Sequence, residues 1–226
     1  MLLPPFRTSN KLIVSQEYGN TSYNSWYLAN GVTAPFHNGI DVVFGDNLQT
    51  YGTECVCPFD NAKVVKVTWE SPTATKGNGV TIESSDIDGK VYQLVFWHTG
   101  EIAVKIGQQL KKGDVVCYVG NSGLCGSSKN GVVVIADREK EPWAGSHCHL
   151  MLFQYDKVTK ANGTQYVMKD SSNGVGGALN PRLLFDFSKC EVGKDTGFEH
   201  DYGVLTSWIN KFPWVKDFFK NKGSNL

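Results

Sequence analysis

Residues 62–98 read AKVVKVTWESPTATKGNGVTIESSDIDGKVYQLVFWH. Three segments of this stretch, 62–69, 79–83 and 92–98, are rich in β-branched and aromatic residues. The segments between them carry Gly, Pro, Asn and Asp, which are typical of turns. The stretch therefore predicts three consecutive β-strands with no helix between them.

The same pattern continues on both sides of this stretch. Further strands are expected at 41–44, 54–57, 115–119, 132–136 and 149–155. Because no helical pattern interrupts the series, the strands should pair antiparallel. The fold class predicted from the sequence is mainly β.

The C-terminal tail has a different pattern. Leu205, Trp208, Ile209 and Phe212 recur at helical spacing, and Pro213 then breaks or restarts the helix. We expect a helix docked on the main domain, with a partner-binding or membrane-surface helix as the alternative.

Composition excludes several classes of protein. The 226 residues include 22 Lys and Arg against 22 Asp and Glu, so no net charge attracts the chain to nucleic acid. No basic segment followed by a long apolar stretch indicates a secretory signal, and no window is apolar enough for a transmembrane segment. The six cysteines match neither a zinc ribbon nor a disulfide scaffold, so free thiols are expected.

Four of the five histidines fall in three short motifs. In Ser146-His147-Cys148-His149-Leu150 the two imidazoles are two residues apart, so on a strand they project from the same face. Cys148, Leu150 and Leu152 should then face the other side. Such a pair suits a metal ion or a proton relay, although His-x-His alone is also common on ordinary surface strands.

The second motif is His37-Asn38-Gly39-Ile40-Asp41, and the third contains His98. In isolation, the motif from His37 to Asp41 also fits an ordinary turn with a solvated Asp. Together, a His, Asp and His ligand set leaves one tetrahedral position open, which is the pattern of catalytic rather than structural zinc. Two further histidines then remain for proton transfer.

The order of these motifs resembles that of the lysostaphin-type or LytM-type peptidoglycan endopeptidases, peptidase family M23, over roughly residues 12–186. The shared features, in chain order, are Tyr18-Gly19, His37-Asn38-Gly39-Ile40-Asp41, Gly77-Asn78-Gly79, Phe96-Trp97-His98, Gly120-Asn121-Ser122-Gly123, His147-Cys148-His149 and Asn180-Pro181-Arg182.

The resemblance implies a site for one Zn²⁺ per chain, held by His37, Asp41 and His149. It implies His147 and His98 as the catalytic histidines. We favour His147 as the general base because it lies beside His149, but the two roles could be interchanged. The implied fold is an antiparallel β barrel or sandwich of the LytM type with an open groove.

This chain departs from the family pattern at several positions. Cys148 and Leu150 replace the usual residues around the second His, and the upstream Tyr of some members is absent, with Tyr23 and Tyr27 as possible substitutes. Residues 124–146 look like an inserted hairpin at the rim of the groove. We therefore divide the chain into a peptidase domain, 1–186, and a C-terminal extension, 187–226.

The implied function is zinc-dependent hydrolysis of peptide cross-links or stem peptides in bacterial peptidoglycan. The enzyme would act on the cell wall, and delivery by a phage particle or by cell lysis would fit the lack of an evident signal. The alternatives are an inactive M23-like module that binds or regulates, and a biotinyl- or lipoyl-carrier barrel suggested by residues 107–119. The sequence does not indicate which bond is cut.

Overall fold

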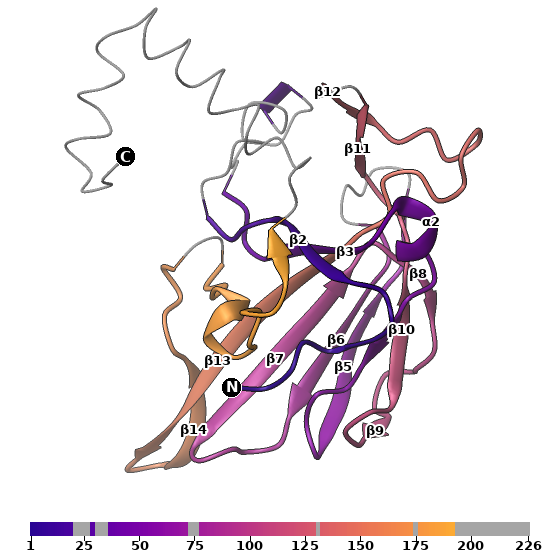
Figure 1. The fold of residues 1–226 in the computed structure, drawn as a ribbon. Coiled ribbons are helices and arrows are strands. Elements are labelled where there is room, and N and C mark those ends of the chain that lie inside the picture. Colours follow the sequence, from indigo (N-terminus) through magenta and orange to yellow (C-terminus); the bar gives the residue numbers. More distant parts are fainter. Residues whose placement is uncertain (20–27, 30–35, 72–76, 130–131, 174–175, 193–226) are drawn as a thin grey trace, which may run out of the picture.

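The computed structural model describes the chain except for residues 20–27, 30–35, 72–76, 130–131, 174–175 and 193–226. Within the described residues nearly all regular structure is β (Figure 1). The described helical elements include a one-turn helix, α2 (Asn47–Thr50), and a 3₁₀ turn, η1 (Pro181–Leu183). The predicted mainly β, antiparallel fold class is confirmed.

The largest sheet contains nine strands. Eight follow one another across it: β15 (Glu191–Val192), β2 (Leu12–Gln16), β3 (Ile40–Phe44), β13 (Cys148–Lys160), β7 (Lys90–Trp97), β6 (Gly79–Ser84), β5 (Ala62–Thr68) and β9 (Gln109–Leu110). The ninth, β14 (Gly163–Met168), forms a hairpin with the far end of β13. All of these pairings are antiparallel except that of β15 with β2, which is parallel.

A four-stranded sheet lies beside the first. Its order is β1 (Phe6–Arg7), β4 (Glu54–Val56), β10 (Val115–Val119) and β8 (Thr99–Ile102), all antiparallel. A separate hairpin, β11 (Gly126–Lys129) with β12 (Val132–Ile135), projects from one end of the molecule. This hairpin forms the first half of the predicted insertion, 124–146.

The main core joins the two larger sheets. Val42, Phe96 and Leu150 from the large sheet pack in one cluster with Cys117 and Val119 from the small one. Each is at most 1% exposed. Fully burying such a side chain stabilises the fold by about 1.5–3 kcal/mol, which explains why these alternating positions decide the pairing of the sheets.

Strand β13 is covered on both faces. Cys148 and Leu150 belong to the main core, whereas Met151 packs with Val95 and Ala178 in a second cluster. This alternation matches the predicted one. The strand is longer than predicted because the hairpin with β14 extends it to Lys160.

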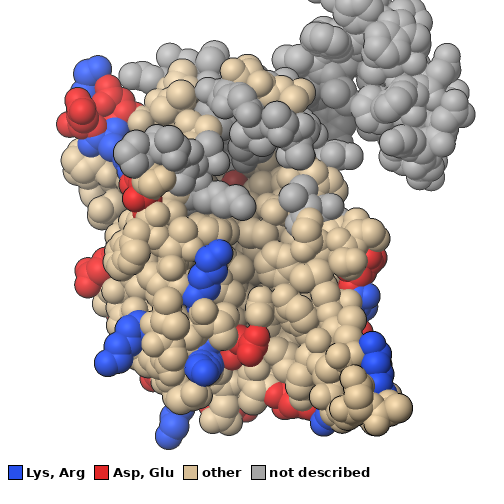
Figure 2. Space-filling view, turned by 180° about the vertical axis from the view of Figure 1, so that it is seen from behind, with Lys and Arg blue, Asp and Glu red and all other residues tan. Residues whose placement is uncertain are grey.

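The surface shows no concentration of basic charge on the face drawn in Figure 2. Among its described residues, Lys and Arg side chains lie apart from one another, with wide uncharged areas and several carboxylates between them. Among the described residues, no helix has the length and apolar character needed to cross a membrane. The predicted tail helix lies outside the described residues, so the domain division at 186 stays a prediction.

Candidate metal centre and active site

Three of the predicted site residues meet at one point. Nε2 of His37 lies 3.1 Å from Oδ1 of Asp41 and 2.9 Å from Nδ1 of His149. The distance from His149 Nδ1 to the same carboxylate oxygen is 2.9 Å. Two nitrogens and one oxygen thus face one another in a group that could hold a metal ion.

Strand pairing brings His149 to the other two residues, although it lies over a hundred positions after them in the sequence. Asp41 is the second residue of β3 and lies directly opposite His149, the second residue of β13. His37 is held just before β3 by two backbone hydrogen bonds with Gly19. The Gly19 N–H donates to the His37 carbonyl at 2.8 Å, and the His37 N–H donates to the Gly19 carbonyl at 2.9 Å. The register of β3 with β13 therefore brings His149 to Asp41, and the bridge to Gly19 places His37 beside them.

Gly39 is required by the close approach of two strands. A Cβ atom at this position would lie 2.4 Å from the carbonyl oxygen of Leu150 and 2.9 Å from Nε2 of His149. Real Cβ atoms do not come so close to a backbone oxygen. The glycine of His-x-Gly-x-Asp therefore lets the β3 segment pack directly against the ring of a candidate ligand.

The protein fixes which nitrogen of His37 faces the other ligands. Nδ1 lies 2.7 Å from the carbonyl oxygen of Glu17. A carbonyl can only accept, so Nδ1 donates its proton there and Nε2 keeps its lone pair. This outer hydrogen bond is typical of metal-binding histidines.

Electrostatics in the group favour an ionised carboxylate. Burial opposes ionisation of Asp41, but the neighbouring His37, His147 and His149 hold its pKa well below the ordinary value. Burial lowers the pKa of His149 to about 4 despite its contact with Asp41. At neutral pH His149 is therefore neutral, with a lone pair available to a metal ion.

The two remaining predicted histidines lie beside this group. The ring centroids of His98 and His147 are 4.6 Å apart, and Nε2 of His147 is 3.9 Å from Oδ1 of Asp41. His98 follows β7 with a φ of 59°, and His147 precedes β13 in an isolated bridge with Gly120. The structure thus brings together all five residues singled out from the sequence.

Backbone carbonyls also orient these two rings. Nδ1 of His98 lies 2.7 Å from the carbonyl of Ser122, and Nδ1 of His147 lies 2.9 Å from that of Gly145. In each ring Nδ1 therefore carries the proton and Nε2 carries the lone pair. Both histidines can accept a proton at Nε2.

The environment moves the two pKa values in opposite directions. Burial lowers the pKa of His98. Burial also acts to lower that of His147, but the Asp41 carboxylate and Cys125 together outweigh it and the pKa is raised. Opposite shifts in neighbouring histidines are typical of an acid–base pair.

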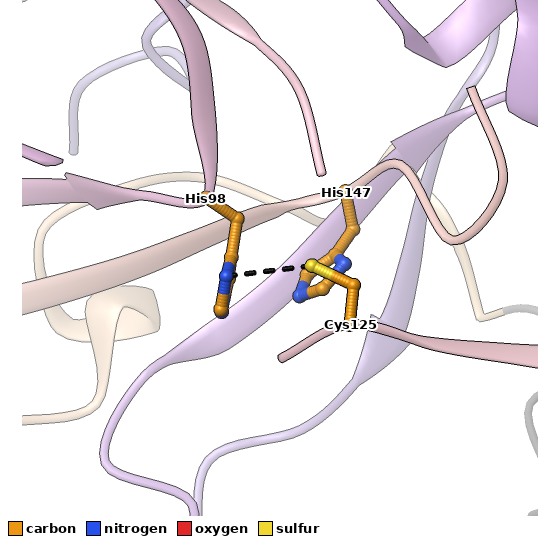
Figure 3. A group of neighbouring side chains, drawn as sticks. All are labelled: His98, Cys125 and His147. Carbon is orange, nitrogen blue, oxygen red and sulfur yellow. Dashed lines mark hydrogen bonds between the residues drawn. The ribbon is translucent and has the colours of Figure 1, made fainter. Parts of the chain in front are cut away.

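A third residue, which no sequence motif indicates, lies beside these histidines. Sγ of Cys125 lies 3.5 Å from Nδ1 of His98, and the thiol is 2% exposed (Figure 3). Like the other five cysteines it is free. No local motif marks it, because its position depends on the fold of the insertion.

The base of the insertion is anchored next to His147. The Asn121 side-chain amide donates to the carbonyls of Pro142 and Ala144 at 2.9 and 2.8 Å. Arg138 makes two hydrogen bonds, at 3.1 and 2.9 Å, to Glu70 at the end of β5. Tyr23 and Tyr27 lie outside the described residues.

The sequence model of peptidase family M23 matches residues 35–143. This part of the chain belongs to peptidase family M23. The match contains His37, Asp41 and His98 and ends four residues before His147. In this M23 domain it is the pairing of β13 with β3 and β7 that adds His147 and His149 to the site.

Solved structures similar to this M23 chain include the catalytic domain of the antimicrobial peptidase lysostaphin from Staphylococcus simulans, at 17% identity and a TM-score of 0.45. That alignment covers 77% of this chain and 91% of the other. A variant catalytic domain of the prophage-encoded M23 protein EnpA from Enterococcus faecalis is 23% identical, with coverage of 76% and 98% and a TM-score of 0.42. A zinc-containing peptidase from Vibrio cholerae is 17% identical, with coverage of 75% and 40% and a TM-score of 0.38. No curated protein sequence matches the chain.

Proposed function

We propose that this protein is a zinc-dependent endopeptidase that acts on the bacterial cell wall, where it hydrolyses cross-links or stem peptides of peptidoglycan. His37, Asp41 and His149 would hold one Zn²⁺, and His147 and His98 would transfer protons. The observation that carries the proposal is the convergence of three ligand atoms within 3.1 Å of one another, with two imidazole bases beside them.

The donor set fits zinc. Two imidazole nitrogens and one carboxylate oxygen are common zinc ligands, and three protein ligands leave one position for water or substrate. Two observations support this: the Glu17 carbonyl accepts the Nδ1 proton of His37, and the neighbouring histidines hold the pKa of Asp41 below its ordinary value. When bound, zinc would lower the pKa of a water molecule to roughly 7 and polarise the scissile carbonyl.

The histidines account for the movement of protons. Nε2 of His147 lies 3.9 Å from the Asp41 carboxylate, so it borders the position that the three ligands leave open. It would accept a proton from the attacking water and return it to the leaving amine. His98, on the neighbouring ring, would stabilise the charge that develops on the carbonyl oxygen when Nε2 also carries a proton and donates it in a hydrogen bond.

The cell-wall substrate follows from family membership and from the surroundings of the site. Trp143, on the insertion, is 40% exposed, and Trp69, beside Glu70, is 64% exposed. Large exposed aromatic rings offer apolar contact area to an extended peptide. Since Arg138 binds Glu70, the two segments that carry these rings are held together.

The decisive experiment combines metal analysis with substrate digestion. The purified full chain is expected to retain about one zinc per molecule and to release peptides with new amino and carboxyl ends from purified peptidoglycans, identified by mass spectrometry. Chelation should stop cleavage, and added Zn²⁺ should restore it. Peptidoglycans with Gly-Gly and with D-Ala–diamino acid cross-links show which bond is cut. Stoichiometric zinc without cleavage of either type would instead indicate a binding or regulatory module.

A further inference from the structure

A second cluster of metal-ligating side chains lies next to the first. His98, Cys125 and His147 each offer one ligand atom, and these atoms all lie within 4.8 Å of one another (Figure 3). The three residues come from different segments: the turn after β7, the loop before β11 and the residue before β13. None of the three belongs to the His37, Asp41 and His149 group.

The spacing suits a single metal ion. Zinc lies about 2.0–2.1 Å from a histidine nitrogen and about 2.3 Å from a thiolate sulfur, so tetrahedral ligands are about 3.3–3.6 Å apart. Sγ of Cys125 is already 3.5 Å from Nδ1 of His98, so to bind the ion there the ring would move its proton to Nε2 and give up its hydrogen bond to the Ser122 carbonyl. Small side-chain rotations would bring the remaining distances into range.

The protein holds the thiol in this position. Cys125 is 2% exposed, its carbonyl accepts a hydrogen bond from the backbone of Ala136 at 2.9 Å, and its thiol donates to the carbonyl of Ser122 at 3.5 Å. The Ser122 carbonyl also accepts the Nδ1 proton of His98. Because these groups are ordered before any ion arrives, binding loses little conformational entropy.

We propose that His98, Cys125 and His147 form a second metal site, which takes a thiophilic divalent ion such as Zn²⁺ or Cd²⁺ and inhibits the enzyme when filled. A thiolate and two imidazoles select these ions over Mg²⁺ and Ca²⁺. On binding, the Cys125 thiol releases its proton to solvent and Sγ forms the metal bond. Inhibition follows because the ion occupies imidazole lone pairs that the proposed hydrolysis needs, so this consequence rests on the proposed function.

Metal binding is tested without activity. Metal-free full-length protein is titrated with Zn²⁺, Cd²⁺ or Co²⁺ under reducing conditions. The expected result is two bound ions per chain, with a sulfur-to-cobalt charge-transfer band appearing with the second equivalent of Co²⁺. Cys125→Ser and Cys125→Ala should bind one ion and lack the band. Cys190→Ser, which changes a partly buried thiol that lies in neither cluster, should behave as the unmodified chain does.

The activity measurement tests the inhibition. For each protein, the rate of peptidoglycan hydrolysis with excess Zn²⁺ is divided by the rate of the same protein with one equivalent of Zn²⁺. Loss of an outer hydrogen-bond partner already weakens metal binding by about 10–100-fold, so loss of the thiolate ligand should raise the inhibitory Zn²⁺ concentration at least that much. A single bound ion in the unmodified chain, or a band that persists in both Cys125 variants, would overturn the second site. A filled second site with an unchanged rate would overturn the inhibition alone. If no protein cleaves peptidoglycan, the proposed function fails while the titration still decides the site.

Discussion

The two histidine-containing groups of this protein differ in how the chain holds them. Asp41 and His149 lie on paired strands in direct register, and His37 is fixed by a backbone bridge to Gly19. His98 and His147, in contrast, lie in a turn and at a strand end, next to a loop cysteine. A sheet allows little adjustment of its side chains, whereas turns and strand ends allow more. This difference would suit the first group to the proposed permanent ion and the second to the proposed proton transfer and reversible binding.

The largest effect is expected from removing a ligand of the first group. Asp41→Ala and His149→Ala should each lose zinc and reduce hydrolysis by at least about 10⁴-fold, beyond the usual cost of losing a proton-transfer group, because no spare ligand is available. Zinc content after gel filtration and the rate of peptide release are the measurements. Asp60→Ala, which changes an exposed carboxylate, is the matched control. Full zinc retention in either variant would remove that residue from the ligand set.

A smaller loss is expected from the two histidines that we propose to be catalytic. His147→Ala and His98→Ala should keep zinc at the first site but lower the rate by about 10²–10⁴-fold, since each removes a proton-transfer group without removing a ligand. Zinc content, circular dichroism and turnover are compared for the two variants. If His147→Ala lost zinc while His149→Ala kept it, the roles of that pair would have to be exchanged.

Gly39→Ala tests the rigidity of the first group without touching a ligand. The added methyl would collide with the Leu150 carbonyl and the His149 ring, so the strands must separate. Metal affinity should fall by about 10–100-fold, as it does when the outer partners of ligands are disturbed. Gly100→Ala is a suitable control because its Cβ would meet nothing closer than 3.6 Å. Equal zinc affinity in the two variants would show that the first group tolerates displacement.

The smallest effect is expected from the insertion. Replacing residues 126–144 by a short Gly-Ser linker removes Trp143 and Arg138 but leaves Cys125 and both histidines. We expect zinc to be retained and the ratio of rates on different peptidoglycans to change by about tenfold, the lower end of what one apolar contact contributes to selectivity. Unchanged rates and preference on every substrate would show that the insertion plays no part in substrate selection.

Much of the two larger sheets could be predicted from local pattern. Strands 62–68, 79–84 and 115–119 carry alternating or continuous apolar residues bounded by turn residues, and they appear within a residue or two of their expected positions. The short strands β1, β9 and β15 could not be predicted, since two residues have no periodicity. The parallel pairing of β15 with β2 depends on the route by which the chain returns, which local sequence does not encode.

The sequence by itself determined the residue types and order of the candidate site: His37, Asp41, His98, His147 and His149, with a glycine at 39. Residue spacing on a strand was enough to place the last two histidines on one side. The tertiary structure decided which nitrogens face inward, because the carbonyls that accept their protons belong to Glu17, Ser122 and Gly145, and a backbone carbonyl has no sequence signature. It also decided the place of Cys125, since only the anchored insertion brings that thiol to His98.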